Sequence, residues 1–160
     1  MRRRLAALAV FTALAVGSSA HAAQQNDPLG DLLSSILSGA LPGTGVFNVK
    51  ATLYHAGAKG VGVLDSLGCK VVPMRTLAVD KNVIPRRTVV FIKETVGLKM
   101  PNGEAHDGYW YASDVGGAIK GQRIDLYTGH GAASMKPMKN LSLATLTAVK
   151  VGNFKGCPPG

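Results

Sequence analysis

The sequence predicts a small, mainly β protein, and three observations carry this prediction. Six short segments after residue 45 are rich in β-branched and aromatic residues, and several of them alternate between apolar and polar positions. Each segment is bounded by Gly, Pro, Asn or Asp, which favour turns. No segment between them has the pattern of a long helix. Six strands in about 105 residues favour a small barrel or a sandwich.

The strands follow one another from residue 46 to residue 151. Their length of five to nine residues is usual for strands in globular proteins. We therefore treat residues 46–160 as one β domain. The predicted strands are 46–54, 75–79, 87–92, 108–113, 122–128 and 143–151.

The first 22 residues resemble an export signal. Arg2, Arg3 and Arg4 precede an apolar run, and Ala20-His21-Ala22 fits the small-x-small pattern of a cleavage site. A membrane anchor is the alternative, but the apolar run is short for a bilayer span. We expect residues 1–22 to be removed, leaving an exported bacterial protein, periplasmic or secreted, without a stable membrane anchor.

Residues 23–45 differ in composition from the β domain. Leucine and isoleucine recur there at helical spacing, and Pro42, Gly43 and Gly45 then interrupt the pattern. This predicts a short amphipathic helix in a leader. The helix could pack on the domain or contact a membrane or partner, although it has no basic face. The apolar positions are Leu29, Leu32, Leu33, Ile36 and Leu37.

The charge balance is basic. The formal net charge is +9, and it falls to +6 without Arg2, Arg3 and Arg4 because the signal contains no acid. An exported cation is attracted to polyanions such as cell-wall polymers, although the charge could serve only solubility. Aromatic residues are few and do not interleave with a basic stripe, so nucleic acid is not an expected partner.

Two cysteines, Cys69 and Cys157, are the only ones in the chain. An even count in an exported protein predicts one disulfide, which would hold the C-terminal tail. A catalytic thiol is the alternative, but neither cysteine has a histidine nearby in the sequence.

The acids are scarce, and three of them follow or interrupt apolar strands. Asp80 follows "TLAV", Asp114 follows "YWYAS", and Asp125 lies inside "RIDLY". At a strand end, aspartate commonly caps a turn. If "RIDLY" alternates, Ile124 and Leu126 share one face and Asp125 shares the other with Arg123 and Tyr127. Asp125 could then form an ion pair or transfer protons in a groove.

Other chemistries find little support. The histidines lack the spacing of a metal site, so no metal is expected. Ser113 is not part of a Gly-x-Ser-x-Gly elbow, which disfavours a serine hydrolase. The Gly-rich "GGAIKG" matches no phosphate-binding pattern, and we expect no cofactor.

Three segments together resemble the three-aspartate (3D) domain family. They are "ATLY" (51–54), "LAVDKNVIPRRTVVFI" (77–92) and "YASDVGGAIKGQRIDLYTG" (111–129). The family includes the catalytic barrel of a membrane-bound lytic transglycosylase and secreted bacterial cell-wall proteins. The chain departs from the family pattern at Val115, where Thr is usual, and at Arg86-Arg87, where Leu-Gly is usual.

The resemblance implies a six-stranded double-psi β-barrel with a groove for a peptidoglycan glycan strand. It implies that Asp125 is the catalytic acid and that Asp80 and Asp114 shape the site. It also suggests that a further set of residues contacts the substrate. These are Tyr54, Gly116, Gly117, Lys120 and Arg123.

The function implied is that of a lytic transglycosylase, which can work with one acid, whereas ordinary glycoside hydrolysis needs two carboxylates. That role requires Asp125 to have a raised pKa. The alternative is a non-catalytic peptidoglycan-binding or wall-structural module, and a third possibility is a β-glucan-directed protein with a related barrel. We expect a monomer.

Overall fold

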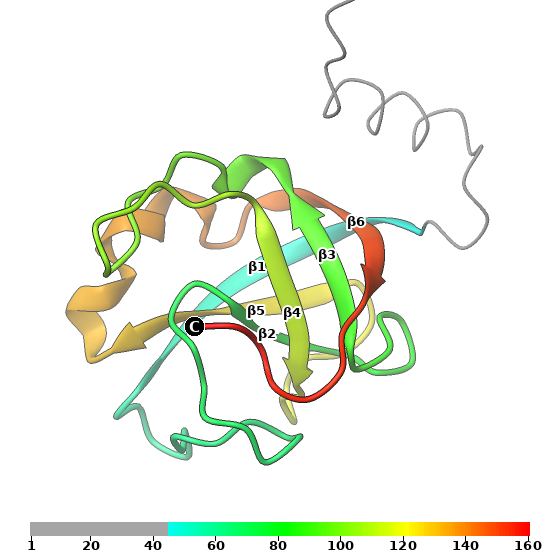
Figure 1. Cartoon of the computed structure of the whole chain (residues 1–160), viewed down its shortest axis with the longest axis horizontal. Helices are drawn as coiled ribbons and strands as arrows, with labels where there is room; N and C mark the ends of the chain where they lie inside the picture. Colours follow the sequence, from blue (N-terminus) through cyan, green and yellow to red (C-terminus); the bar gives the residue numbers. More distant parts are fainter. Residues whose placement is uncertain (1–44) are drawn as a thin grey trace, which may run out of the picture.

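The computed structural model describes residues 45–160, so the predicted signal and the predicted leader helix lie outside the described residues. No helix in the described part is long and apolar enough to cross a membrane. The described part contains six strands and two 3-10 helical segments (Figure 1). They are β1 (Val46–Ala56), β2 (Thr76–Val79), β3 (Thr88–Ile92), η1 (Lys93–Thr95), β4 (Tyr109–Asp114), β5 (Arg123–His130), η2 (Ala132–Leu141) and β6 (Thr145–Asn153).

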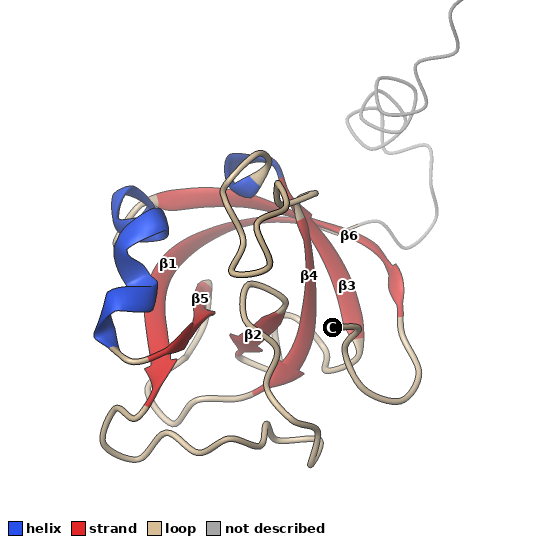
Figure 2. Cartoon of the chain, turned by 60° about the vertical axis from the view of Figure 1, so that its left-hand side comes forward, coloured by secondary structure: helices blue, strands red, loops and turns tan. Residues whose placement is uncertain are grey.

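All six predicted strands are present, with bounds that differ by one to two residues. The sequence did not predict η2, a ten-residue 3-10 segment that contains Pro137 and in which only Met138 is buried. Its sequence lacks the broad apolar stripe by which an amphipathic helix is recognised. Figure 2 shows the helical segments at the top and left and the long β1–β2 connection at the bottom.

The strands close into a barrel in the order β1-β5-β2-β4-β3-β6. Two neighbouring pairs, β1 with β5 and β2 with β4, are parallel, and the other four are antiparallel. The topology has a pseudo-twofold repeat. If β1 is exchanged with β4, β2 with β5 and β3 with β6, the list of paired strands and the direction of each pair stay the same.

The barrel interior is filled by apolar side chains from alternate strand positions. Leu77, Trp110, Ile124 and Leu126 have no exposed surface. The predicted alternation in β5 is therefore confirmed: Ile124 and Leu126 point inward, and Asp125 lies on the outer face, half-buried. The indole nitrogen of Trp110 is satisfied by Thr95 Oγ1 at 3.0 Å, as a buried polar atom requires.

The connection between β1 and β2 runs outside the barrel and is bonded to the C-terminal tail. The predicted disulfide between Cys69 and Cys157 joins the two. The tail is also held by Arg87, whose Nη1 donates to the Gly156 carbonyl at 2.9 Å. The disulfide therefore fixes a segment that lies over the outer face of the barrel, beside Asp114 and Asp125.

Candidate active site

Four outer-face residues form a row across four adjacent strands. Thr52 in β1 pairs with Asp125 in β5, Asp125 pairs with Ala78 in β2, and Ala78 pairs with Asp114 in β4. Two strand spacings separate the two aspartates, so their Cα atoms lie about 10 Å apart. The alanine between them leaves the space above β2 open. Sequence positions 114 and 125 thus become opposite sides of one recess.

A β-bulge places Asp114 on this face. Leu77 pairs with Ala112 but Ala78 pairs with Asp114, so Ser113 is an extra residue in β4. Trp110 and Ala112 point into the barrel, and simple alternation would send Asp114 inward as well. The bulge reverses the alternation for a single position and turns the carboxylate outward.

The β1–β2 connection secures the bulge. Ser66 Oγ donates to the Ser113 carbonyl at 2.9 Å, and the Ser66 amide donates to Asp114 Oδ1 at 3.0 Å. The turn that presents Ser66 is itself capped by Asp65, whose Oδ1 accepts from the amides of Leu67 and Cys69. The disulfide at Cys69 is therefore only three residues from a contact to the site.

Asp114 accepts hydrogen bonds at both carboxylate oxygens. Oδ1 accepts from the amides of Ser66 at 3.0 Å and Val115 at 2.8 Å, and Oδ2 accepts from the Tyr54 hydroxyl at 3.0 Å. Burial and the adjacent Asp114 charge raise the pKa of Tyr54 far above its usual value, so Tyr54 acts as a donor. Three donors therefore hold the Asp114 carboxylate in a fixed position.

Asp125 has the opposite surroundings. Its Oδ1 is buried and has no hydrogen-bond partner among the described residues. Burial raises the pKa of Asp125, and the charge of Asp114 raises it further, whereas a hydrogen bond with Thr52 and the charge of Arg123 oppose the rise. The Thr52 hydroxyl has only one proton, and it donates that proton to the Ile124 carbonyl at 3.2 Å rather than to Asp125. Burial is therefore the dominant influence on the pKa of Asp125, which lies above the usual value of an aspartate.

A cavity of about 270 Å³ holds both aspartates. Its floor is the outer face of the barrel, including Ala78 and Tyr54, and the β1–β2 connection and the turn after β4 form its walls. Apolar groups near a carboxyl group disfavour its charged form, which agrees with the raised pKa of Asp125. The wall residues are Gly60, Val61, Gly62, Leu64, Val71, Val115, Gly116 and Gly117.

Asp80 lies in a neighbouring cavity of about 240 Å³ rather than beside Asp125. Its Oδ1 accepts from the Asn82 amide at 3.0 Å and its Oδ2 from the Gly121 amide at 2.8 Å. These two hydrogen bonds hold the pKa of Asp80 below its usual value, and the charges of Lys120 and Lys81 add to the effect. Asp80 therefore ties the turn after β2 to the turn before β5.

The other predicted contact residues divide between these places. Gly116 and Gly117 line both cavities, and Lys120 lines only the second. Arg123 is exposed and acts on Asp125 through its charge. Sequence reasoning did not find Ser66 or Thr52. Alternation in "ATLY" places Thr52 and Tyr54 on one face, but nothing in the sequence gives their register against Asp125.

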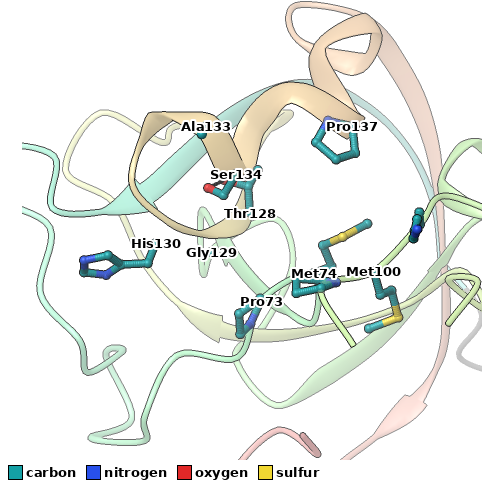
Figure 3. Close-up of a pocket in the computed structure, with 11 residues that line it drawn as sticks. Pro73, Met74, Met100, Thr128, Gly129, His130, Ala133, Ser134 and Pro137 are labelled. Atoms are coloured by element: carbon teal, nitrogen blue, oxygen red, sulfur yellow. Dashed lines mark hydrogen bonds between the residues drawn. The ribbon is translucent and has the colours of Figure 1, made fainter. Parts of the chain in front are cut away.

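Another cavity, about 540 Å³, is elsewhere and contains none of the predicted site residues. It lies between η2, the end of β5 and the loop at residues 99–101. Figure 3 shows Met74 and Met100 between Pro73 below and Pro137 above. Its lining has no carboxylate, so proton transfer by an acid has no candidate there. Nor do three or more His, Cys, Asp or Glu side chains cluster as metal ligands in residues 45–160.

Comparisons with known proteins add the following. The model of the 3D domain family matches residues 75–138, and no curated protein matches the whole sequence. Among solved structures, the lytic transglycosylase MltA of Escherichia coli with bound chitohexaose is 25% identical, with a TM-score of 0.43 over 58% of this chain and 28% of that chain. The lytic transglycosylase LtgG of Burkholderia pseudomallei is 28% identical, with a TM-score of 0.39 over 57% of this chain and 26% of that chain.

The chain spans less than a third of the length of either of these structures. The family match is the more specific finding because its span, about two fifths of the chain, contains all three aspartates singled out in the sequence. It also contains β2, β3, β4 and β5, from which the outer-face row takes three of its four residues. Residues 75–138 therefore match the 3D domain family, and the matched region contains Asp80, Asp114 and Asp125.

Proposed function

We propose that this protein is a lytic transglycosylase-like enzyme of the bacterial envelope that cleaves the glycan strands of peptidoglycan, with Asp125 as its single catalytic acid. The observation that carries the proposal is the contrast within one cavity. Asp125 has a buried oxygen without a partner and a raised pKa, whereas Asp114 is saturated with donors.

The reaction begins with protonated Asp125. It donates its proton to the glycosidic oxygen between N-acetylmuramic acid and N-acetylglucosamine, and the bond from C1 to that oxygen breaks. The 6-hydroxyl of the same muramic acid then adds to C1, and its proton passes to the Asp125 carboxylate. The products are a 1,6-anhydro sugar and a free hydroxyl on the leaving sugar. No water is consumed, and the acid is regenerated.

The arrangement of Asp114 favours this route over hydrolysis. A hydrolase of the usual kind needs a second carboxylate to activate water or attack the sugar. Both oxygens of Asp114 accept hydrogen bonds from the protein, so it is poorly suited to remove a proton. In the proposed mechanism Asp114 raises the pKa of Asp125 and provides negative charge near the positive charge that develops at C1.

Two further features belong to the proposal. We assign the barrel, at residues 46–160, to the double-psi type, which is supported by its pseudo-twofold strand order with two parallel pairs. We also infer export to the periplasm or cell surface and action as a monomer without a cofactor. The disulfide supports export, because such bonds persist mainly in oxidising compartments.

The test is digestion of purified peptidoglycan followed by mass spectrometry of the soluble products. Fragments ending in 1,6-anhydromuramic acid are expected. Reducing-end fragments would instead indicate a hydrolase and contradict the single-acid mechanism. Binding to the polymer without release of fragments would contradict the enzyme and leave a wall-binding module.

A further inference from the structure

The cavity beside the proposed catalytic cavity is lined by three cations. It contains Lys81, Arg86 and Lys120 together with Asp80, and it measures about 240 Å³. The two cavities have Val115, Gly116 and Gly117 in common, so the turn after β4 forms a ridge between them. A ligand that crosses this ridge passes directly from Asp125 to the cationic cavity.

Asp80 offsets only one of the three positive charges. The two oxygens of Asp80 accept from the backbone amides of Asn82 and Gly121, and the salt bridges among residues 45–160 involve neither lysine. Arg86 uses one nitrogen to donate to the Ser66 carbonyl at 3.1 Å, which holds its side chain at the cavity. The charges of Lys120 and Lys81 both lower the pKa of Asp80, so both lysines lie close enough to act on a charged group in this cavity. The cavity therefore has an excess of positive charge and can accept an anion.

The ridge is free of side-chain obstruction at Gly117. A Cβ atom built there would meet nothing within 4 Å, and the backbone does not need a positive φ at this position. Gly117 is thus not required by the fold, unlike Gly116, where a Cβ would lie 2.6 Å from Ile119. Space above Gly117 is available for a ligand that extends across both cavities.

We propose that this cavity is a carboxylate subsite that binds the peptide stem of the substrate, and this inference rests on the proposed function. Uncharged sugars have no anionic group that could pair with three cations, whereas the peptide stem attached to muramic acid carries free carboxylates. Lysine and arginine side chains bind such groups by charge-assisted hydrogen bonds. The subsite selects glycan strands that still bear their peptides, and Arg86 adds a third positive charge to it.

The experiment compares binding of three glycans of equal length by calorimetry in the Asp125→Asn background, which prevents turnover. The first carries intact stems, the second carries bare lactyl carboxylates after amidase treatment, and the third is chitohexaose. Binding is expected to be tightest for the first. Lys81→Gln and Lys120→Gln should each weaken that binding about two- to five-fold, as for exposed ion pairs. Lys93→Gln, an exposed lysine in η1, is the matched control and should change nothing.

The outcomes separate this inference from the proposed function. Equal affinity for the first and third glycans, or an equal loss in the Lys93 variant, overturns the carboxylate subsite while leaving glycan cleavage intact. Equal affinity for the first two glycans overturns the assignment to the stem, because the lactyl group alone would then suffice. If no glycan binds but a free stem peptide does, in a manner that depends on Lys81 and Lys120, the subsite stands and the proposed function fails.

A substitution at the ridge gives an independent check. Gly117→Leu should fold normally because its side chain enters open space. It should reduce the affinity for stem-bearing glycan while leaving the free stem peptide bound in the cationic cavity. Unchanged glycan affinity with a normal melting temperature would show that the ligand does not cross the ridge, which contradicts the proposal.

Discussion

The two aspartates of the outer-face row show how one fold gives two carboxyl groups different surroundings. On β4, the bulge at Ser113 turns Asp114 toward Tyr54 and the amides of Ser66 and Val115. On β5, Asp125 stands in a regular strand and keeps a buried oxygen without a partner among the described residues. The difference teaches that burial, more than the charge of the neighbouring acid, raises the pKa of Asp125.

The largest expected effect comes from Asp125→Asn. Asparagine keeps the size of the side chain but has no acidic proton, so release of anhydro fragments should fall by about 10²- to 10⁴-fold. The measurement is the initial rate of fragment release from purified peptidoglycan. Glu104→Gln, which changes an exposed acid in the loop before β4, is the control and should keep the full rate. A rate within a few-fold of wild type in the Asp125 variant would end the assignment of this residue as the acid.

Removal of the disulfide should affect the Asp114 end first. The double substitution Cys69→Ser and Cys157→Ser releases a loop closure of 88 residues, which costs up to about 4 to 5 kcal/mol of unfolding free energy in the chain-entropy model. The β1–β2 connection would then hold Ser66 less firmly against Asp114. Denaturant unfolding measures the first effect, and the rate of the remaining folded protein measures the second. A stable variant with full activity would show that Ser66 does not depend on the bond.

Asp114→Asn should cost less than the loss of Asp125 in rate but more in stability. The amide can still accept from one side, but it loses the charge that strengthens the bonds from Ser66 and Val115, at about 1 to 3 kcal/mol. It should also lower the pKa of Asp125, because the like charge that raises it is gone. Thermal unfolding and the pH profile of fragment release measure the two effects. If only the rate changes, with stability and pH profile intact, Asp114 has a direct chemical role that the comparison does not assign to it.

Tyr54→Phe isolates a single donor. It removes the hydroxyl that donates to Asp114 Oδ2 and keeps the ring contact with Tyr127, whose centroid lies 5.1 Å away. We expect a loss of about 0.5 to 1.5 kcal/mol of unfolding free energy and a modest fall in rate. Tyr111→Phe, which changes a half-buried tyrosine of β4 whose ring contacts Phe154, is the matched control. An equal loss in both variants would mean that the hydroxyl at position 54 has no special part in holding Asp114.

The smallest effect is a slope in stability with pH. The pKa of Asp125 is higher in the folded protein than in the unfolded chain, so the folded state binds more protons between the two values. Stability therefore falls as pH rises through that window, and the proposed activity falls with it. Asp80, whose pKa is lowered, works in the other direction, and its contribution is lost as pH falls below its unfolded value. The difference between wild type and Asp125→Asn cancels the Asp80 contribution. If that difference in stability did not change with pH above the ordinary pKa of an aspartate, the raised pKa of Asp125 would be contradicted.

Several features followed from the sequence because they depend on neighbours along the chain. Alternation and turn residues located all six strands, and two cysteines in a chain with a predicted export signal indicated the disulfide. The period-two pattern of "RIDLY" placed Asp125 on the outer face before any partner was known. These features depend on local sequence or on composition, and tertiary contacts did not change them.

The tertiary structure alone decided which residues meet. A period-two pattern cannot specify the register between β1 and β5, so Thr52 could not be paired with Asp125 from the sequence. The bulge at Ser113 leaves no signature in composition, yet it determines the direction of Asp114. Ser66 and Lys81 contribute through loops whose paths depend on the disulfide and on the closed barrel. Sequence determined the elements and the supply of carboxylates, whereas the free energy of closing the barrel fixed their register and so their chemistry.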